Sequence, residues 1–497
     1  MKKKYRKRKL PKYFFIISLA LFLFVGIGYS VINSNLTMQG NVVRKATSWS
    51  IGFSNPVFDT GSKTSPTPTI TNGTTMTMNV NLTSPGEKYA FTVDLTNNGN
   101  VPALINTLNI TELTEEQKVY LRWKVEYEDE SPLEVGDLLK AGETKKVHIY
   151  LEYKNLRAKD LYPSAPINLN LSVQANFYLP EETFNTVTVT KNESTKLVQV
   201  SNLIQEATLD DFPIESDDQV IACNNGVEPS TDTNNKIVLS KVKQNATCRI
   251  ESSLANAVTN SGTEVSNIAI LQDATTNTRL TVQANQTINL NLNKKTYTFT
   301  TGNDSSQIIV AGVLNINDTN KEGELKTTQL ALVEYTENSS GIIKNSKLTR
   351  SNANGIGSTI RAGGNMLIFD SIIKSDTSCA VSTYNNNQQI NIENSTIQSN
   401  GNLAIIVTRI NSVFNIKNSI LQVSYNIAIG PNVDTAVDSK VYLCNNTITS
   451  NKYDFRNYIP TLEYYYYNTT FRNSTKTPIL TNPENNNAYQ TELACAE

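Results

Sequence analysis

The chain has 497 residues, of which 39% are hydrophobic and 18% are charged. This length is too great for one compact core and implies two to four domains. The 44 basic residues nearly balance the 45 acidic residues, so no global positive field draws in nucleic acid, and we expect no nucleic-acid partner. The single histidine, His148, excludes any mechanism that needs two imidazoles, including a helical HExxH zinc site.

The N-terminus carries an export signal. Eight basic residues lie between positions 2 and 12, and an uncharged apolar run follows, from Tyr13 to about Ile32. A basic cluster stays in the cytoplasm while the chain behind it crosses the membrane. We therefore assign residues 1–34 to an export signal or membrane anchor and expect a secreted or cell-surface protein. The run is long for a cleaved signal and just long enough to span a bilayer, so cleavage near Val31 and retention as an anchor both stay open.

Residues 48–180 predict an antiparallel β-sandwich. Apolar and polar residues alternate in four runs, at 49–53, 89–95, 147–151 and 167–173. Alternation with a period of two indicates half-buried strands, and turn signals such as Ser84-Pro85-Gly86 separate them. One short helix, 114–121, interrupts the strands. His148 lies on an alternating strand, which favours a solvent-facing strand residue over a metal ligand.

Residues 181–262 predict a connector framed by two cysteines. Cys223 and Cys248 flank two short strands joined by a polar turn, and an exported compartment permits a disulfide between them. A zinc site would need further Cys or His nearby. After this hairpin, residues 254, 257 and 258 are apolar at helical spacing, and this helix could cover the open end of the sheets that follow. We expect Cys379 to be a buried apolar side chain, and Cys444 and Cys495 to be free or surface thiols.

A repeat with a period of about 24 residues fills the segment 263–480 and leaves 481–497 as a tail. The phrase Ile-x-Asn-Ser-x-Ile recurs at nearly equal intervals, from Ile343, Ile368, Ile392, Ile416 and Leu443. Inward apolar residues around a polar bend are what a right-handed parallel β-helix requires, and weaker echoes suggest about eight turns. We predict a ladder of bend residues, because Asn and Asp tolerate the left-handed backbone: Asn345, Asp370, Asn394, Asn418 and Asn445.

Two resemblances follow from these patterns. The order GIGYSVINSNLTMQGN, WSIGFSN and SPGEKYAFTVDLTNNGNVPALI resembles the secreted camelysin/TasA-type β-sandwich family of Gram-positive bacteria, and this likeness extends to about position 180. It implies an exported surface or matrix component, whereas the protease activity described for some members has no support with one histidine. Residues 265–475 resemble the pectate-lyase-like β-helix superfamily, which implies an architecture and no reaction.

These patterns lead to three functional hypotheses. The first is an exported structural or adhesive protein whose β-helix binds a glycan or a surface protein of a host or neighbouring cell. The second is a polysaccharide lyase or hydrolase, for which Arg409, Asp434 and Asp438 are the candidate catalytic residues. The third is a matrix fibre subunit that assembles through the sandwich. We expect no cofactor or metal; calcium stays open as an alternative, although no residue pattern in the sequence supports it. The run 464–467, four tyrosines, is either a sugar-stacking platform or a final coil with alternate rings inward.

Overall fold

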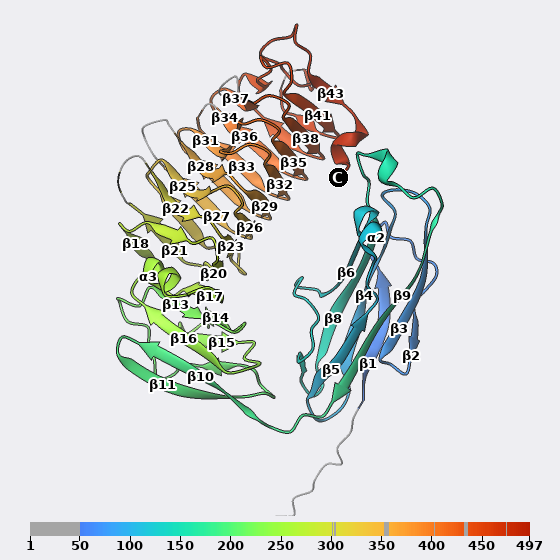
Figure 1. Ribbon diagram of the computed structural model, residues 1–497, viewed down its shortest axis with the longest axis vertical. Helices are drawn as coiled ribbons and strands as arrows, with labels where there is room; N and C mark the ends of the chain where they lie inside the picture. Colours follow the sequence, from blue (N-terminus) through green and yellow to red (C-terminus); the bar gives the residue numbers. More distant parts are fainter. Residues whose placement is uncertain are drawn as a thin grey trace, which may run out of the picture. The chain divides into compact units, whose positions relative to one another are not determined.

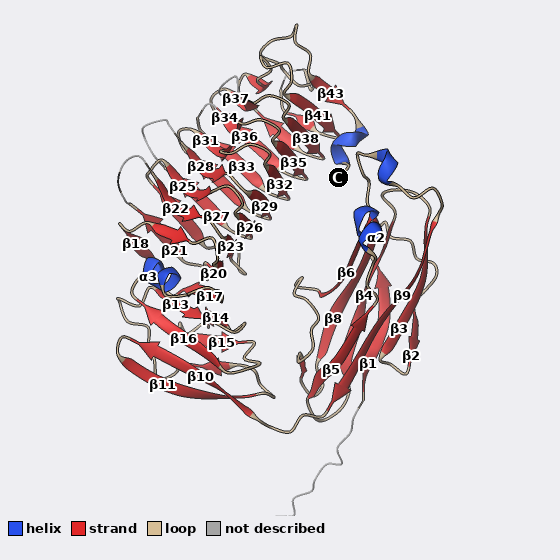
Figure 2. Ribbon diagram, in the orientation of Figure 1, coloured by secondary structure: helices blue, strands red, loops and turns tan. Residues whose placement is uncertain are grey.

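The computed structural model describes residues 50–300, 302, 305–351, 357–401, 403–431, 436–473 and 475–497. The expected export segment, 1–34, and Asp434 lie outside these residues. None of the helices within them is long and apolar enough to cross a membrane. The described chain is almost entirely β-structure (Figure 2), with antiparallel sheets first and a right-handed parallel β-helix after them (Figure 1). The predicted fold class is confirmed.

Two antiparallel sheets form the N-terminal part. The first contains, in spatial order, β1 (Ile51–Phe58), β4 (Lys88–Asn97), β8 (Thr144–Tyr153) and β6 (Leu121–Tyr127). The second contains β2 (Thr69–Thr71), β3 (Thr75–Leu82), β9 (Ile167–Tyr178), β5 (Ala103–Ile110) and β7 (Leu138–Leu139). Alternate side chains of both sheets share one buried core, as in Phe91, Val147 and Val173, each 0% exposed. The period-two pattern thus places the hydrophobic side chains inside.

The predicted helix of this part is α2 (Glu115–Tyr120). Thr114 caps it: its hydroxyl accepts the Gln117 backbone N–H, and the Gln117 side chain accepts the Thr114 N–H. This reciprocal capping satisfies N–H groups that the first helical turn leaves without partners. A single 3₁₀ turn, η1 (Lys159–Leu161), precedes β9.

The connector is joined to the β-helix more closely than the sequence predicts. Its strands β10 (Phe184–Lys191), β11 (Ser194–Ser201), β16 (Ala246–Glu251) and β13 (Val220–Cys223) extend the first sheet of the β-helix, which has 14 strands in all. Cys223 and Cys248 are direct register partners and form the predicted disulfide. A small separate sheet holds β12 (Ala207–Thr208), β15 (Ile237–Ser240) and β14 (Glu228–Thr231).

Three parallel sheets build the β-helix. The first continues through β17 (Val265–Ile270), β20 (Thr287–Asn291), β23 (Val313–Asn317), β26 (Ser340–Lys344), β29 (Asn365–Phe369), β32 (Gln389–Glu393), β35 (Val413–Lys417), β38 (Lys440–Cys444), β41 (Glu463–Tyr467) and β43 (Ala488–Gln490). The second holds β18 (Ala274–Thr276), β21 (Thr296–Phe299), β24 (Glu324–Thr327), β27 (Lys347–Arg350), β30 (Ile372–Ser375), β33 (Thr396–Ser399), β36 (Ile420–Val423), β39 (Thr447–Thr449) and β42 (Thr470–Phe471). The third holds β19 (Leu280–Val282), β22 (Ser306–Val310), β25 (Ala331–Tyr335), β28 (Ser358–Ala362), β31 (Cys379–Thr383), β34 (Leu403–Val407), β37 (Ile427–Pro431) and β40 (Tyr453–Phe455).

Both ends of the β-helix are covered. At the N-terminal end, α3 (Leu254–Thr259) buries the predicted residues Leu254, Ala257 and Val258 against the first coils. At the other end, the chain after β42 crosses the last coil: the Ile479 N–H bonds to the Asp454 carboxylate at 2.9 Å. The 3₁₀ turn η2 (Glu492–Cys495) follows β43. These covers shield apolar side chains and strand edges that an open coil would expose.

The predicted bend ladder is present. Asn345, Asp370, Asn394, Asn418 and Asn445 all have left-handed backbone, with φ between 48° and 54°. After four of these bends a buried serine bonds both within its own coil and across to a neighbouring coil. The Ser395 hydroxyl donates to the Glu393 carbonyl at 2.7 Å and accepts the Ser371 N–H at 3.0 Å, and the Ser395 N–H donates to the Ser419 hydroxyl at 3.1 Å. We call the series Ser346, Ser371, Ser395 and Ser419 the serine ladder.

Removing one hydroxyl of the serine ladder should destabilise the β-helix. Ser395→Ala leaves the Ser371 N–H buried without an acceptor, which costs about 1–3 kcal/mol. We expect a lower denaturation midpoint for the β-helix, followed by circular dichroism. Ser424→Ala is the matched control, because Ser424 is exposed and, among the described residues, its side chain bonds only to the Asn400 side chain. Equal midpoints for the two variants would show that the ladder does not stabilise the coils.

Candidate functional site

The outward face of the first β-helix sheet carries one continuous column of side chains, which we call the outer row. Amide side chains bond from coil to coil at its start: Asn315 donates to Asn289 at 2.9 Å, and Asn289 donates to Asn267 at 2.9 Å. Ile342, which is 43% exposed, and then Leu367 continue the column. Two further asparagines follow, and tyrosines complete it at Tyr442, Tyr465 and Tyr489.

The tyrosine run closes the β-helix. Tyr464 is fully buried and stacks on Phe455, with ring centroids 4.5 Å apart, while Tyr466 packs edge-on against Phe471. Tyr465 points outward and lies nearly parallel to the Tyr442 ring, 5.0 Å away. Tyr465 lies between the Tyr442 and Tyr489 rings, so both of its flat faces are covered, and Tyr442 is only 8% exposed, whereas Tyr489 at the end of the column is 42% exposed. The arrangement matches the closing coil with alternate rings inward and not a flat platform for sugars.

Two of the candidate catalytic residues, Arg409 and Asp438, lie in the turns that follow the third sheet in adjacent coils, whereas Asp434 lies outside the described residues. Arg409 follows β34, and its Nε donates to the Tyr384 carbonyl at 2.7 Å. Asp438 has left-handed backbone with φ 56°, as do Asn387 and Asn411 in the equivalent turns of the two preceding coils. Its local role is therefore that of a bend residue. Within the described part of the chain, no ion pair joins Asp438 to Arg409. A catalytic role for Arg409, Asp434 and Asp438 stays a prediction.

One acidic cluster has the composition of a cation site. Among the described residues, Glu215, Asp217 and Asp218 are the group whose carboxylate oxygens lie within 4.8 Å of one another. The Lys191 ammonium lies 2.7 Å from Asp218 and 2.8 Å from Glu215, so it offsets one of the three negative charges. Burial opposes the charged form of Lys191, but these two carboxylates outweigh it and raise its pKa. Two of its three carboxylates thus form a salt bridge within the connector.

His148 is paired rather than isolated. Its Nε2 lies 2.9 Å from the Asp59 carboxylate, and its side chain is 26% exposed on β8. The position agrees with the expected strand residue at the surface. One imidazole beside one carboxylate supplies neither the ligand number of a zinc site nor an adjacent nucleophile.

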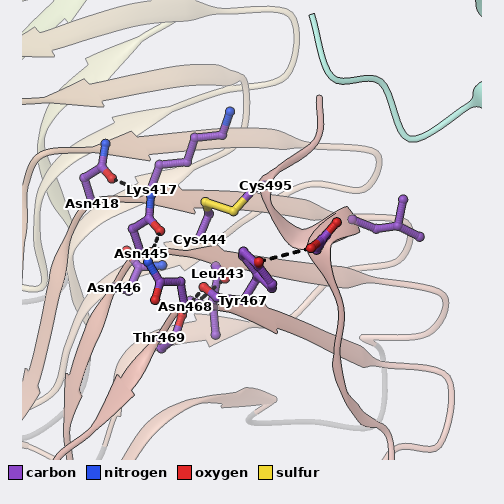
Figure 3. The surroundings of a disulfide bond; sticks show 12 residues. Lys417, Asn418, Leu443, Cys444, Asn445, Asn446, Tyr467, Asn468, Thr469 and Cys495 are labelled. Carbon is purple, nitrogen blue, oxygen red and sulfur yellow. Dashed lines mark hydrogen bonds between the residues drawn. A yellow bond between two sulfur atoms is a disulfide. The ribbon is translucent and has the colours of Figure 1, made fainter. Parts of the chain in front are cut away.

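The prediction for Cys444 and Cys495 is wrong. They form a disulfide, although 51 residues separate them. Cys444 points outward from β38 and η2 brings Cys495 over it, as Figure 3 shows. A hydrogen bond from the Tyr467 hydroxyl to Glu492, at 3.1 Å, holds η2 on the same face. The Cys444–Cys495 disulfide fastens η2 to the last coils of the β-helix.

Cys379 is the one free cysteine of the described chain, and it is buried as predicted. Its register partner in the preceding coil is Ser358, whose hydroxyl lies 2.9 Å from the sulfur. Burial raises the pKa of the Cys379 thiol to about 11. A thiol that stays protonated and inaccessible is a poor nucleophile, so this cysteine contributes to packing.

Neither a family model, nor a curated protein, nor a solved structure matches this chain. The structure itself defines the class: an all-β protein in which an antiparallel sandwich precedes a right-handed parallel β-helix. The resemblances to the camelysin/TasA-type and pectate-lyase-like families therefore find no support in these comparisons and stay predictions from the sequence.

The cysteines should differ in reactivity. Cys223, Cys248 and Cys444 are at most 5% exposed, whereas Cys495 is half-buried, so mild reduction should open Cys444–Cys495 first. We expect iodoacetamide at about pH 8 to label no cysteine of the native protein, and Cys444 and Cys495 after brief treatment with dithiothreitol. Peptide mass spectrometry identifies the labelled sites. Denatured and reduced protein, with all five cysteines labelled, is the positive control.

Proposed function

We propose that this protein is an exported structural or adhesive component of the cell surface, whose β-helix binds a glycan or a surface protein. The observation that carries the proposal is the regularity of the outward columns, of which the outer row is the longest described. Its asparagines bond and its tyrosines stack on one another from coil to coil, with Ile342 and Leu367 between them. A surface that repeats along an axis suits an extended ligand or a neighbouring protein.

Rigidity supports the same role. The serine ladder and the left-handed bends fix each coil to the next, and both ends of the β-helix are covered. A preformed surface loses little conformational entropy when a ligand binds. Export is the second element of the proposal, and it is supported by the basic cluster at 2–12 and the apolar run behind it.

Glycan binding without cleavage is the expected outcome for the purified full-length protein. We would apply it to a glycan array and test every bound polysaccharide for reducing-sugar release, with and without calcium. Asp438→Asn is an informative variant, because asparagine occupies the equivalent bend in two other coils and only the carboxylate is lost. We expect this variant to bind as the wild type does. Sugar release that disappears in Asp438→Asn would replace the adhesive proposal with the enzymatic one.

A second candidate function, a matrix fibre subunit, is favoured by a groove in the sandwich. The groove has a volume of about 810 Å³ and lies between the ends of β5 and β6, with Leu108, Trp123 and Lys124 in its lining. β6 is the last strand of its sheet. A strand edge beside a groove could receive a strand from another copy of the chain.

Filament formation tests this second candidate. A fibre subunit should form filaments as its concentration rises, seen by negative-stain electron microscopy and by sedimentation. The Tyr127 N–H donates to the Ser131 carbonyl, away from β8, so strand alternation directs the Val125 N–H to the same outer side. Val125→Pro removes this donor and should abolish assembly, whereas Val125→Ala keeps the donor and is the matched control. A wild type that stays monomeric at all concentrations would exclude the fibre hypothesis.

A further inference from the structure

One edge of the 14-stranded sheet ends in a long, regular strand. β11 is the first strand of this sheet (Figure 1), and its strand partner within the described chain is β10. It has eight residues, whereas β43 at the opposite edge has three. Its sequence contains no proline, glycine or acidic residue, and Lys196 is its one charged residue. β11 thus lacks most of the features by which proteins block the pairing of edge strands.

The edge strand β1 of the sandwich shows such protection. It contains Pro56, and its register with β4 is irregular between Ser54 and Val57. Proline removes a backbone donor, and a bulge turns the edge away from an approaching strand. Neither feature occurs in β11, whose residues pair with β10 in unbroken register.

Every second residue of β11 faces away from β10. The Asn202 N–H donates to the Thr183 carbonyl at 2.9 Å, directly beyond the register pairs of the two strands. Because bonding and non-bonding residues alternate along an antiparallel strand, the even-numbered residues of β11 bond to β10 and the odd-numbered residues face away from it. Ser201 agrees with this alternation, since its carbonyl accepts the N–H groups of Ile204 and Gln205, which lie outside β10.

Three residues of β11 direct free backbone groups outward. Thr195, Leu197 and Gln199 are odd-numbered, so their N–H and carbonyl groups point away from β10. Among the residues that the structure describes, none bonds to these backbone groups. All three side chains are exposed, and Leu197 is 66% exposed. Free donors and acceptors beside an exposed leucine form a template for a further strand.

β11 is complementary to a second copy of itself. In an antiparallel pair centred on Leu197, this leucine lies opposite Leu197 of the second copy, and Thr195 lies opposite Gln199 of the second copy. All three outward residues of each strand then exchange backbone hydrogen bonds, roughly six in total. The two leucines cover each other, and each threonine hydroxyl lies beside an amide side chain that can bond to it.

Charge selects this register. With Leu197 at the centre, Lys196 lies opposite the uncharged Val198 of the second copy. A centre at Lys196 would place two lysines directly opposite one another, which is unfavourable. A centre at Val198 would place Thr195 opposite Ser201, whose carbonyl already accepts two N–H groups. The pairing centred on Leu197 therefore satisfies the most backbone groups without opposing like charges.

We propose that the protein forms a two-fold symmetric dimer in which β11 pairs antiparallel with β11 of a second copy, centred on Leu197. The first sheet of one β-helix then continues into the first sheet of the other. An interface that uses the same patch on both copies is the commonest basis of a closed dimer. Such a dimer presents the outer row twice, and two linked surfaces hold a multivalent target more strongly than one. The dimer goes beyond the proposed adhesive function and does not depend on the ligand.

Sedimentation equilibrium of the full-length protein in density-matched detergent tests the dimer. We expect the mass to rise reversibly with concentration from 55.0 kDa to twice that value. Thr195→Lys with Gln199→Lys places lysines opposite one another at two positions of the pair, and Thr195→Lys with Gln199→Glu is the matched variant that places a lysine opposite a glutamate there. We expect the first to raise the dissociation constant about tenfold or more, and the second to dimerise at least as tightly as the wild type. Association through the apolar run at 13–32 is common to all three proteins.

Cysteine cross-linking tests the register. Leu197→Cys places two cysteines opposite one another, with Cα atoms about 5.5 Å apart, a separation that a disulfide spans. Mild oxidation should therefore give a covalent dimer, seen by non-reducing gel electrophoresis. Thr195→Cys is the matched control, because the two copies of residue 195 lie roughly 13 Å apart in this register and should not cross-link. The free Cys379 is buried and should stay unreacted.

The outcomes separate the dimer from the adhesive function. A wild type that is monomeric at every concentration, or equal dissociation constants for the two charge variants, would overturn the dimer. Equal cross-linking of the two cysteine variants would overturn the pairing centred on Leu197. Every variant should keep the circular dichroism and the denaturation midpoint of the wild type, so that a loss of dimer reports the edge strand and not the fold. Glycan binding by a monomeric wild type would leave the adhesive function standing.

Discussion

The β-helix depends on satisfying the backbone at its bends. Within the strands each N–H and carbonyl finds a partner in the adjacent coil, but at a bend the chain leaves the sheet and its polar groups become buried without a regular partner. The Asn-Ser dipeptide provides both the turn of the backbone and a hydrogen-bond partner for a buried N–H. The asparagine adopts the left-handed backbone, and the serine hydroxyl accepts an N–H from the preceding coil, as Ser395 does for Ser371. Stacking then buries the apolar side chains of successive coils in one core.

The same constraint explains how the β-helix begins and ends. A stack of coils exposes apolar side chains and open strand edges at each end, which invite pairing with other chains. At the start, α3 covers the core while β13, β16, β10 and β11 extend the first sheet. At the end, the crossing chain and η2 cover the last coil, and the Cys444–Cys495 disulfide fastens them. The elements outside the repeat therefore hinder the pairing of further strands with the coils at either end of the β-helix.

The sequence predicts the repeated parts well because their signals recur. The repeat period, the left-handed bends and the inward isoleucines return from coil to coil, and the structure confirms them. Features that occur once leave no such signal. Cys495 lies outside the repeat, and its approach to Cys444 depends on η2 packing Ala494 and Ala496 into buried positions. The contact between Arg409 and Tyr384, 25 residues earlier, is of the same kind, because it follows from the stacking of coils and from no local signal.

The continuity of the first sheet has a mechanical consequence. The chain enters the β-helix through β10, which pairs along eight residues with β11 and along five with β16. A force transmitted from the N-terminal part would act along this strand, so the hydrogen bonds on both of its sides would be loaded in shear and would have to fail together. A strand at the edge of the sheet would instead peel away one bond at a time. Its interior position thus makes β10 a junction that resists tension along the chain.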